Sequence, residues 1–181
     1  MNYGIIRYII GKVIEIEGAF LAIPVLTALV YREWSGLGVY VLLACLYMFA
    51  GFIMSSKEPE KKEFYAREGY VLAALAWIIM SILGAIPFVI TGDIPSMADA
   101  VFEIASGFTT TGASILASPE PLLKCNLMWR SFSHWIGGMG VLVFLIAILP
   151  SGGGESIYIM KAESTGPSVG KIVPRIKQTS K

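Results

Sequence analysis

Four long apolar segments limit what this chain of 181 residues can fold into. They span residues 13–31, 36–54, 69–91 and 127–149, and each is bounded by charged residues, glycine or proline. A helix of about 20 mostly apolar residues crosses the roughly 30 Å of hydrocarbon in a bilayer. Since 55% of the residues are hydrophobic and 15% are charged, we predict an all-α membrane protein with four transmembrane helices.

The first span is the least regular of the four. Its helix is expected to begin near Tyr3, and Pro24, which lacks a backbone donor, predicts a kink within it. Before the kink the helix carries four charged residues through the interface: Arg7, Lys12, Glu15 and Glu17.

Lysine and arginine are divided unequally between the two sides of this topology. All but three of the 14 Lys and Arg residues fall in the N-terminal stretch, the loop at 55–68 or the tail after residue 150. Basic loops are retained in the cytoplasm, so we expect a multi-pass protein of the plasma (inner) membrane with both termini cytoplasmic. The formal net charge is +1 and the basic residues form no stripe, which argues against a nucleic-acid partner.

The segment at 92–126 then lies outside, yet residues 98–108 are too apolar for a solvated loop. Ser96 and Asp99 resemble a capping box, and a helical apolar spacing follows at Met97, Val101, Ile104 and Ala105. A helix of about eleven residues reaches roughly 16 Å, half of the bilayer. We therefore predict a re-entrant half-helix.

A small, polar run follows this half-helix: Ser106-Gly107-Phe108-Thr109-Thr110-Thr111-Gly112-Ala113-Ser114. Consecutive threonines supply closely spaced carbonyls and hydroxyls that can replace water around a cation. The negative end of the helix dipole would point at the run, which also favours a cation. We interpret the run as an ion filter, and the alternative is an ordinary Ser/Thr/Gly loop.

Several motifs occur in a fixed order along the chain. After Ile86-Pro87-Phe88 come Phe102-Glu103 with the filter run, Trp129-Arg130-Ser131 with Trp135-Ile136-Gly137-Gly138-Met139-Gly140, Lys161-Ala162-Glu163-Ser164-Thr165-Gly166-Pro167, and Pro174-Arg175-Ile176. As an ordered set they resemble the N-terminal part of the Trk/Ktr/HKT potassium transporter family, specifically its Trk-H-like membrane subunit, over essentially the whole chain.

The resemblance implies an architecture of four covalently linked repeats around one pore, with two additional helices before the first repeat. Residues 1–56 would be the two additional helices and 57–150 a helix-pore loop-helix repeat. Residues 151–181 would be a cytoplasmic linker, truncated before a second repeat. One copy would then supply about a quarter of a pore.

The resemblance also implies site residues and partners. The backbone carbonyls of Thr109, Thr110, Thr111 and Gly112 would be this repeat's share of the potassium sites, with Thr110 and Thr111 central and Gly112 favouring potassium over sodium. The expected partners are potassium, membrane lipid, the remaining repeats or further copies of the chain, and a cytoplasmic nucleotide-binding regulatory subunit. Potassium is the substrate, and no cofactor is expected.

Other polar residues near the outer side have two interpretations each. Asp99 and Glu103 are candidates for cation-attracting charges at the pore mouth, although Asp99 can instead cap the half-helix. Arg130 shares a helix face with His134 and can pair with an acid such as Glu103 or reach the headgroups. The glycines at 137, 138 and 140 favour close helix packing or a hinge.

The function favoured by these patterns is potassium uptake or conduction as part of a Trk-H-like transporter subunit. Two alternatives stay open: a one-repeat channel formed by four copies of the chain, and a non-conducting structural fragment. An intramembrane enzyme using His134 is disfavoured, because none of the four predicted spans contains a G-x-S-x-G or an H-E-x-x-H motif.

Overall fold

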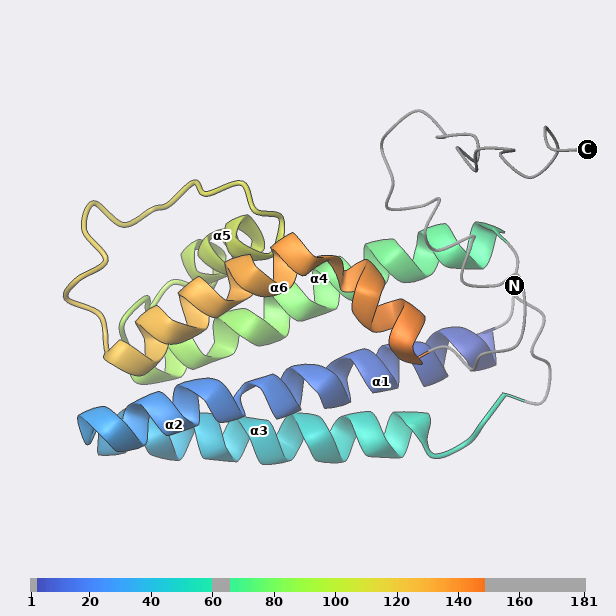
Figure 1. Cartoon of the computed structure of the whole chain (residues 1–181), viewed down its shortest axis with the longest axis horizontal. Coiled ribbons are helices and arrows are strands. Elements are labelled where there is room, and N and C mark those ends of the chain that lie inside the picture. The colour runs from blue at the N-terminus through green and yellow to red at the C-terminus, as the bar shows by residue number, and fades with distance from the viewer. Residues whose placement is uncertain (1–2, 60–65, 149–181) are drawn as a thin grey trace, which may run out of the picture.

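The computed structural model describes residues 3–59 and 66–148, and within them the regular structure is helical, with no strand (Figure 1). The helices are α1 (Tyr3–Phe20), α2 (Ala22–Tyr31), α3 (Trp34–Ser55), α4 (Ala66–Thr91), α5 (Met97–Phe108) and α6 (Lys124–Ile148). The prediction of an all-α protein is therefore confirmed for the described part of the chain.

The helices form two layers (Figure 1). In one layer α1 and α2 run in line and antiparallel to α3, and in the other the short α5 packs against both α4 and α6. The layers meet where α1 contacts α4 and α2 contacts α6. The start of α1, the end of α3 and the end of α6 lie at one end of the molecule, and the α2–α3 turn lies at the other.

Three helices in the described part of the chain are long and apolar enough to cross a membrane: Tyr3–Tyr31, Trp34–Ser55 and Gly69–Thr91. They match the first three predicted spans, and the first helix begins at Tyr3 as expected. The fourth predicted span, 127–149, coincides with α6 as a helix, and its crossing of the bilayer stays a prediction. The predicted linker at 151–181 and its two motifs lie outside the described residues.

The break in the first span lies at Leu21, between α1 and α2. Pro24 is three residues further on and has no N–H to donate to the carbonyl four residues before it. The chain still follows one course across the break, because Leu21 donates to the Glu17 carbonyl and Val25 donates to the Leu21 carbonyl, both at 3.2 Å. The kink expected from Pro24 is thus a short interruption.

Glycine lets α1 and α3 approach closely. A Cβ on Gly51 would lie 2.6 Å from the Glu15 nitrogen and from the Gly11 carbonyl oxygen, and a Cβ on Gly11 would lie 2.8 Å from the Met54 Cβ. Close backbone contact of this kind compensates in lipid for the missing hydrophobic driving force. It fixes α1 on α3, and α1 in turn supports α4.

Candidate functional site

Helix α5 carries the candidate site at its C-terminal end. Its N-terminus is capped by Ser96, whose hydroxyl accepts a hydrogen bond from the Asp99 backbone nitrogen at 3.4 Å. The predicted helix over 98–108 is therefore present as Met97–Phe108. The Asp99 carboxylate lies in the first turn and is exposed, where it complements the positive end of the helix dipole.

The chain leaves α5 through a tight turn. Thr110 donates its backbone N–H to the Gly107 carbonyl and Thr111 donates to the Ser106 carbonyl, both at 2.9 Å. This pair of bonds is the Schellman arrangement, which places the residue after the cap in the left-handed region. That residue is Thr110, with φ of 55°.

A β-branched residue at positive φ is a genuine outlier. Glycine is the usual residue at this position of a Schellman turn, so the chain carries strain where the sequence places the filter. Gly112 follows with φ of 76°, which glycine adopts at little cost. The turn is tied back to the helix because Ser106 Oγ donates to the Ala113 carbonyl at 2.6 Å.

Residues 109–112, called the filter segment from here on, lie at the surface of the described structure. All four residues are exposed, and no hydrogen bond between described residues is accepted by a carbonyl of the segment. The threonine hydroxyls are engaged locally: Thr109 Oγ1 donates to the Ala105 carbonyl at 2.8 Å and lies 2.7 Å from Thr111 Oγ1. The segment thus offers unused acceptors next to the negative end of a helix.

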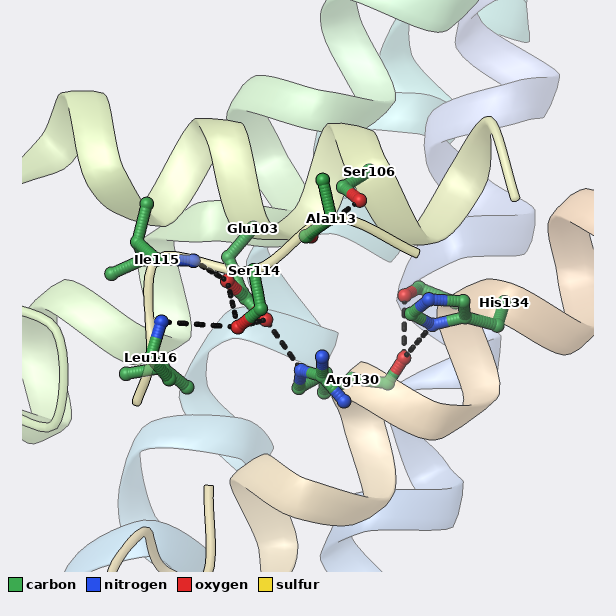
Figure 2. A network of polar contacts seen from close by, with 9 residues as sticks. Glu103, Ser106, Ala113, Ser114, Ile115, Leu116, Arg130 and His134 are labelled. Carbon is green, nitrogen blue, oxygen red and sulfur yellow. Dashed lines mark hydrogen bonds and ion pairs between the residues drawn. The ribbon is translucent and has the colours of Figure 1, made fainter. Parts of the chain in front are cut away.

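Glu103 holds the chain that returns from the filter segment (Figure 2). Its carboxylate accepts a hydrogen bond from Ser114 Oγ at 2.9 Å and another from the Ile115 backbone nitrogen at 3.0 Å. Arg130 Nε of α6 lies 2.5 Å from Glu103 Oε1. Glu103 is 1% exposed, so in this chain its charge faces Arg130 and the loop rather than solvent.

Helix α6 packs directly on the end of α5. A Cβ on Gly137 would overlap the Phe108 carbonyl, and a Cβ on Gly107 would overlap the Ser133 hydroxyl. Of the three glycines predicted to pack or to hinge, Gly137 is thus a packing residue, whereas a Cβ on Gly138 would meet nothing within 4 Å. The surroundings of Gly140 lie outside the described part of the chain. His134 Nδ1 lies 2.9 Å from the Arg130 carbonyl within α6.

Trp129 joins α6 to the other helices of the site. It is fully buried, its indole N–H donates to the Gly84 carbonyl of α4 at 2.8 Å, and its ring meets Phe108 edge to face at 6.3 Å. A buried Trp needs a hydrogen-bond partner, and α4 supplies it. Two residues of the motif Trp129-Arg130-Ser131, Trp129 and Arg130, therefore support the filter segment.

A polar cluster fixes the N-terminus of α6 at the α2–α3 end of the molecule. Glu33 accepts hydrogen bonds from the backbone nitrogens of Lys124 at 2.7 Å and Cys125 at 3.0 Å. Asp93 accepts from the Leu123 nitrogen at 2.8 Å and from Asn126 Nδ2 at 2.6 Å. A carboxylate at a helix N-terminus satisfies otherwise unpaired donors and complements the dipole.

The electrostatic state of Glu33 reflects this cap. Partial burial raises the pKa of Glu33, but the hydrogen bonds from Lys124 and Cys125, with the charge of Lys124, outweigh it, and the pKa is lowered. Sequence analysis missed Glu33, Asp93 and Asn126, since each looked like a loop or helix-end residue. Their one sequence signal is that Asn126 is polar at the start of an apolar helix.

A family model described as a cation transport protein, TrkH, matches residues 40–181. The Trk system potassium uptake protein TrkH of Escherichia coli K12 is 33% identical over 184 residues, which cover 100% of this chain and 38% of that protein. An uncharacterized cation transporter of Methanocaldococcus jannaschii is 34% identical over 159 residues, which cover 88% of this chain and 33% of that protein.

A second uptake protein of Escherichia coli K12, TrkG, is 27% identical over 179 residues, covering 98% of this chain and 37% of that protein. The chain thus spans little more than a third of the length of the relatives it matches.

Proposed function

The chain belongs to the TrkH family of cation transport proteins, and from this premise we propose that it forms part of a potassium uptake subunit in the plasma (inner) membrane. The three membrane-capable helices in the described part of the chain suit a membrane protein, and the family is one of transporters rather than enzymes. The observation that carries the proposal is the filter segment: four exposed residues with unused carbonyls at the end of a short helix.

The carbonyls of Thr109, Thr110, Thr111 and Gly112 coordinate a dehydrated potassium ion, with Thr110 and Thr111 at the centre. Carbonyl oxygens replace the water that the ion gives up. The C-terminal end of α5 carries a partial negative charge of about half an electron, which favours a cation at this point. In this proposal α5 is re-entrant, and the filter segment lies within the bilayer.

The two acids near the filter have different tasks in this proposal. Asp99 is exposed at the N-terminal end of α5, where it attracts cations to the outer mouth. Glu103 acts indirectly: with Arg130 it holds Ser114 and Ile115 and so sets the course of the chain after the filter segment.

The filter segment of one chain lines about a quarter of an ion cage. We propose that residues 1–56 are two additional helices, that 57–150 are the first helix-pore loop-helix repeat, and that further repeats complete the pore. Both termini lie in the cytoplasm. The tail after residue 150 is then on the correct side to meet a cytoplasmic nucleotide-binding regulatory subunit.

Flux into liposomes tests the proposal. The chain is reconstituted with and without the remainder of a TrkH-type subunit, and rubidium uptake is measured for the native sequence, for Gly112→Ser and for a variant with residues 109–112 scrambled. We expect rubidium uptake when the native chain is combined with the remainder of the subunit. We expect this uptake to be lost when residues 109–112 are scrambled. Gly112→Ser is expected to lower the ratio of rubidium to sodium uptake.

The same preparation separates the alternatives. Flux from the chain without other repeats, together with a detergent-solubilised mass of four copies, would favour the one-repeat channel instead. Equal rubidium uptake by the native chain and by both filter variants would contradict the role of the filter segment. Binding of the chain to the remaining repeats without any flux would indicate a structural fragment.

A further inference from the structure

Glu17 is a carboxylic acid buried within a membrane-capable helix. It lies midway along the span Tyr3–Tyr31 and is 0% exposed. Neither of its carboxyl oxygens has a hydrogen-bond partner within the described part of the chain. Intramembrane acids are rare and costly, and a buried acid without a partner is rarer still.

The carboxyl lies where three helices meet. Gly84 of α4 leaves room for it, because a Cβ on Gly84 would lie 3.3 Å from Glu17 Oε1. The same Cβ would lie 3.0 Å from Ile104 Cγ2 and 3.2 Å from Phe108 Cε2 of α5. Glu17 therefore shares one small space with the last residue of α5, and the filter segment begins at the next residue.

The ionisable groups of the surrounding helices do not neutralise Glu17. Tyr47 of α3 is close enough to interact with it electrostatically, but the phenol donates its O–H to the Leu83 carbonyl of α4 at 2.8 Å. On α5 and α6, Glu103 and Arg130 pair with each other, and His134 faces the Arg130 carbonyl. On α4, the span at 69–91 contains no Asp, Glu, Lys, Arg or His.

A carboxylate in such a place costs far more free energy than the neutral acid, because its charge would be neither hydrated nor paired. We propose that Glu17 is a proton-binding site: its carboxyl carries a proton at neutral pH, and loss of that proton displaces the last turn of α5. The first half of this proposal concerns Glu17 itself. The second half, that ion passage depends on this proton, rests on the proposed function.

Infrared spectroscopy of the full chain in liposomes tests the first half. The difference between the infrared spectra of native protein and Glu17→Gln at pH 7 should contain the carbonyl band of a protonated acid. Raising the pH of the native protein should then remove this band. Glu15→Gln is the matched control, since Glu15 lies two residues away and pairs with Lys12 at 2.8 Å, and it should remove a carboxylate band instead. Absence of the acid band from native protein would overturn the site.

Rubidium flux as a function of pH tests the second half in the assembled transporter. The protonated fraction of Glu17 falls about tenfold for each pH unit above its titration midpoint. The rubidium flux of native protein should therefore fall over the same pH range as the infrared band of the protonated acid. Glu17→Gln should hold its neutral-pH flux across that range, and Glu17→Asp should restore a pH response. Identical pH profiles for native protein and Glu17→Gln would overturn the coupling, whereas an acid band without flux at any pH would refute the proposed conduction and leave the proton site intact.

Discussion

At the scale of single residues, the site depends on one charge pair beneath the filter segment. Glu103 is buried and accepts from Ser114, Ile115 and Arg130 (Figure 2). Removal of one partner leaves the other charge uncompensated in a poorly hydrated place, which costs more than the intact pair contributes. The two partners are not equivalent, because Arg130 is the more exposed of them.

We expect Arg130→Leu to destabilise the protein by about 3 kcal/mol, because it strands the Glu103 carboxylate. Glu103→Gln should cost less, since the amide oxygen can still accept from Ser114 and Ile115. Thermal unfolding in detergent measures both, and the double variant Arg130→Leu with Glu103→Gln gives the coupling. Additive effects of the two single changes would contradict a direct pair.

Some of these site residues could be predicted from the sequence, and others could not. Asp99, Glu103 and Arg130 attracted attention because charges near apolar segments are costly, and the alternative that Arg130 pairs with Glu103 followed from their types. Nothing in the sequence predicted the positive φ of Thr110. It arises from the Schellman turn, and a threonine at that position contradicts local preference.

At the scale of the helix, α6 approaches the end of α5 closely at Gly137. A Cβ on Gly137 would overlap the Phe108 carbonyl, whereas a Cβ on Gly138 would meet nothing within 4 Å. The adjacent glycines therefore form a natural matched pair. Both lie in one helix and share the same intrinsic helix propensity.

Gly137→Ala is expected to push α6 away from α5 and to destabilise the protein by roughly 2 kcal/mol, the usual range for an overpacked core. Gly138→Ala should instead stabilise it by about 0.5–1 kcal/mol, because alanine favours a helix over glycine. Melting temperatures of the two variants in one detergent provide the comparison. Equal shifts would mean that the close approach at Gly137 does not support the filter segment.

The cap on α6 makes a prediction about pH. Because the pKa of Glu33 is lower in the folded protein than its ordinary value of 4.5, the charged cap contributes stability above that value and loses it as pH falls through the folded pKa. Glu33→Ala should cost about 1 kcal/mol at pH 7, the usual value of a cap. The difference from native protein should shrink below about pH 4.5 in thermal melts, and a constant difference would contradict an ionised cap.

Sequence reasoning located the helices because length and hydropathy are local properties. It missed the cap because Glu33 and Lys124 are 91 residues apart and meet only after α2, α3 and α6 have packed. A carboxylate in a two-residue turn between spans carries no sign of the helix that it will cap. The same holds for Asp93 with Asn126, which are 33 residues apart.

At the scale of the whole molecule, Arg7 and Lys57, two of the basic residues that predict the orientation, lie at the same end. Arg7 donates to the Lys57 carbonyl at 3.5 Å, so the start of α1 and the end of α3 adjoin. The cap on α6 lies at the other end, where Glu33 follows α2 (Figure 1). If basic segments remain in the cytoplasm, the end with the cap faces outward, and under the proposed function potassium enters from it.

Cysteine labelling in intact cells tests this orientation and the number of crossings. With Cys45 and Cys125 replaced by serine, single cysteines are introduced at Ser56, Ser118 and Ser151, the first two of which are exposed. A membrane-impermeant maleimide should label Ser118→Cys from outside and the other two only after permeabilisation. Labelling of Ser151→Cys from outside would mean that α6 does not cross the membrane. Labelling of Ser56→Cys from outside would mean that the orientation of the protein is the reverse of the predicted one. The second result would place the filter segment towards the cytoplasmic side, which contradicts potassium uptake through an outward-facing mouth.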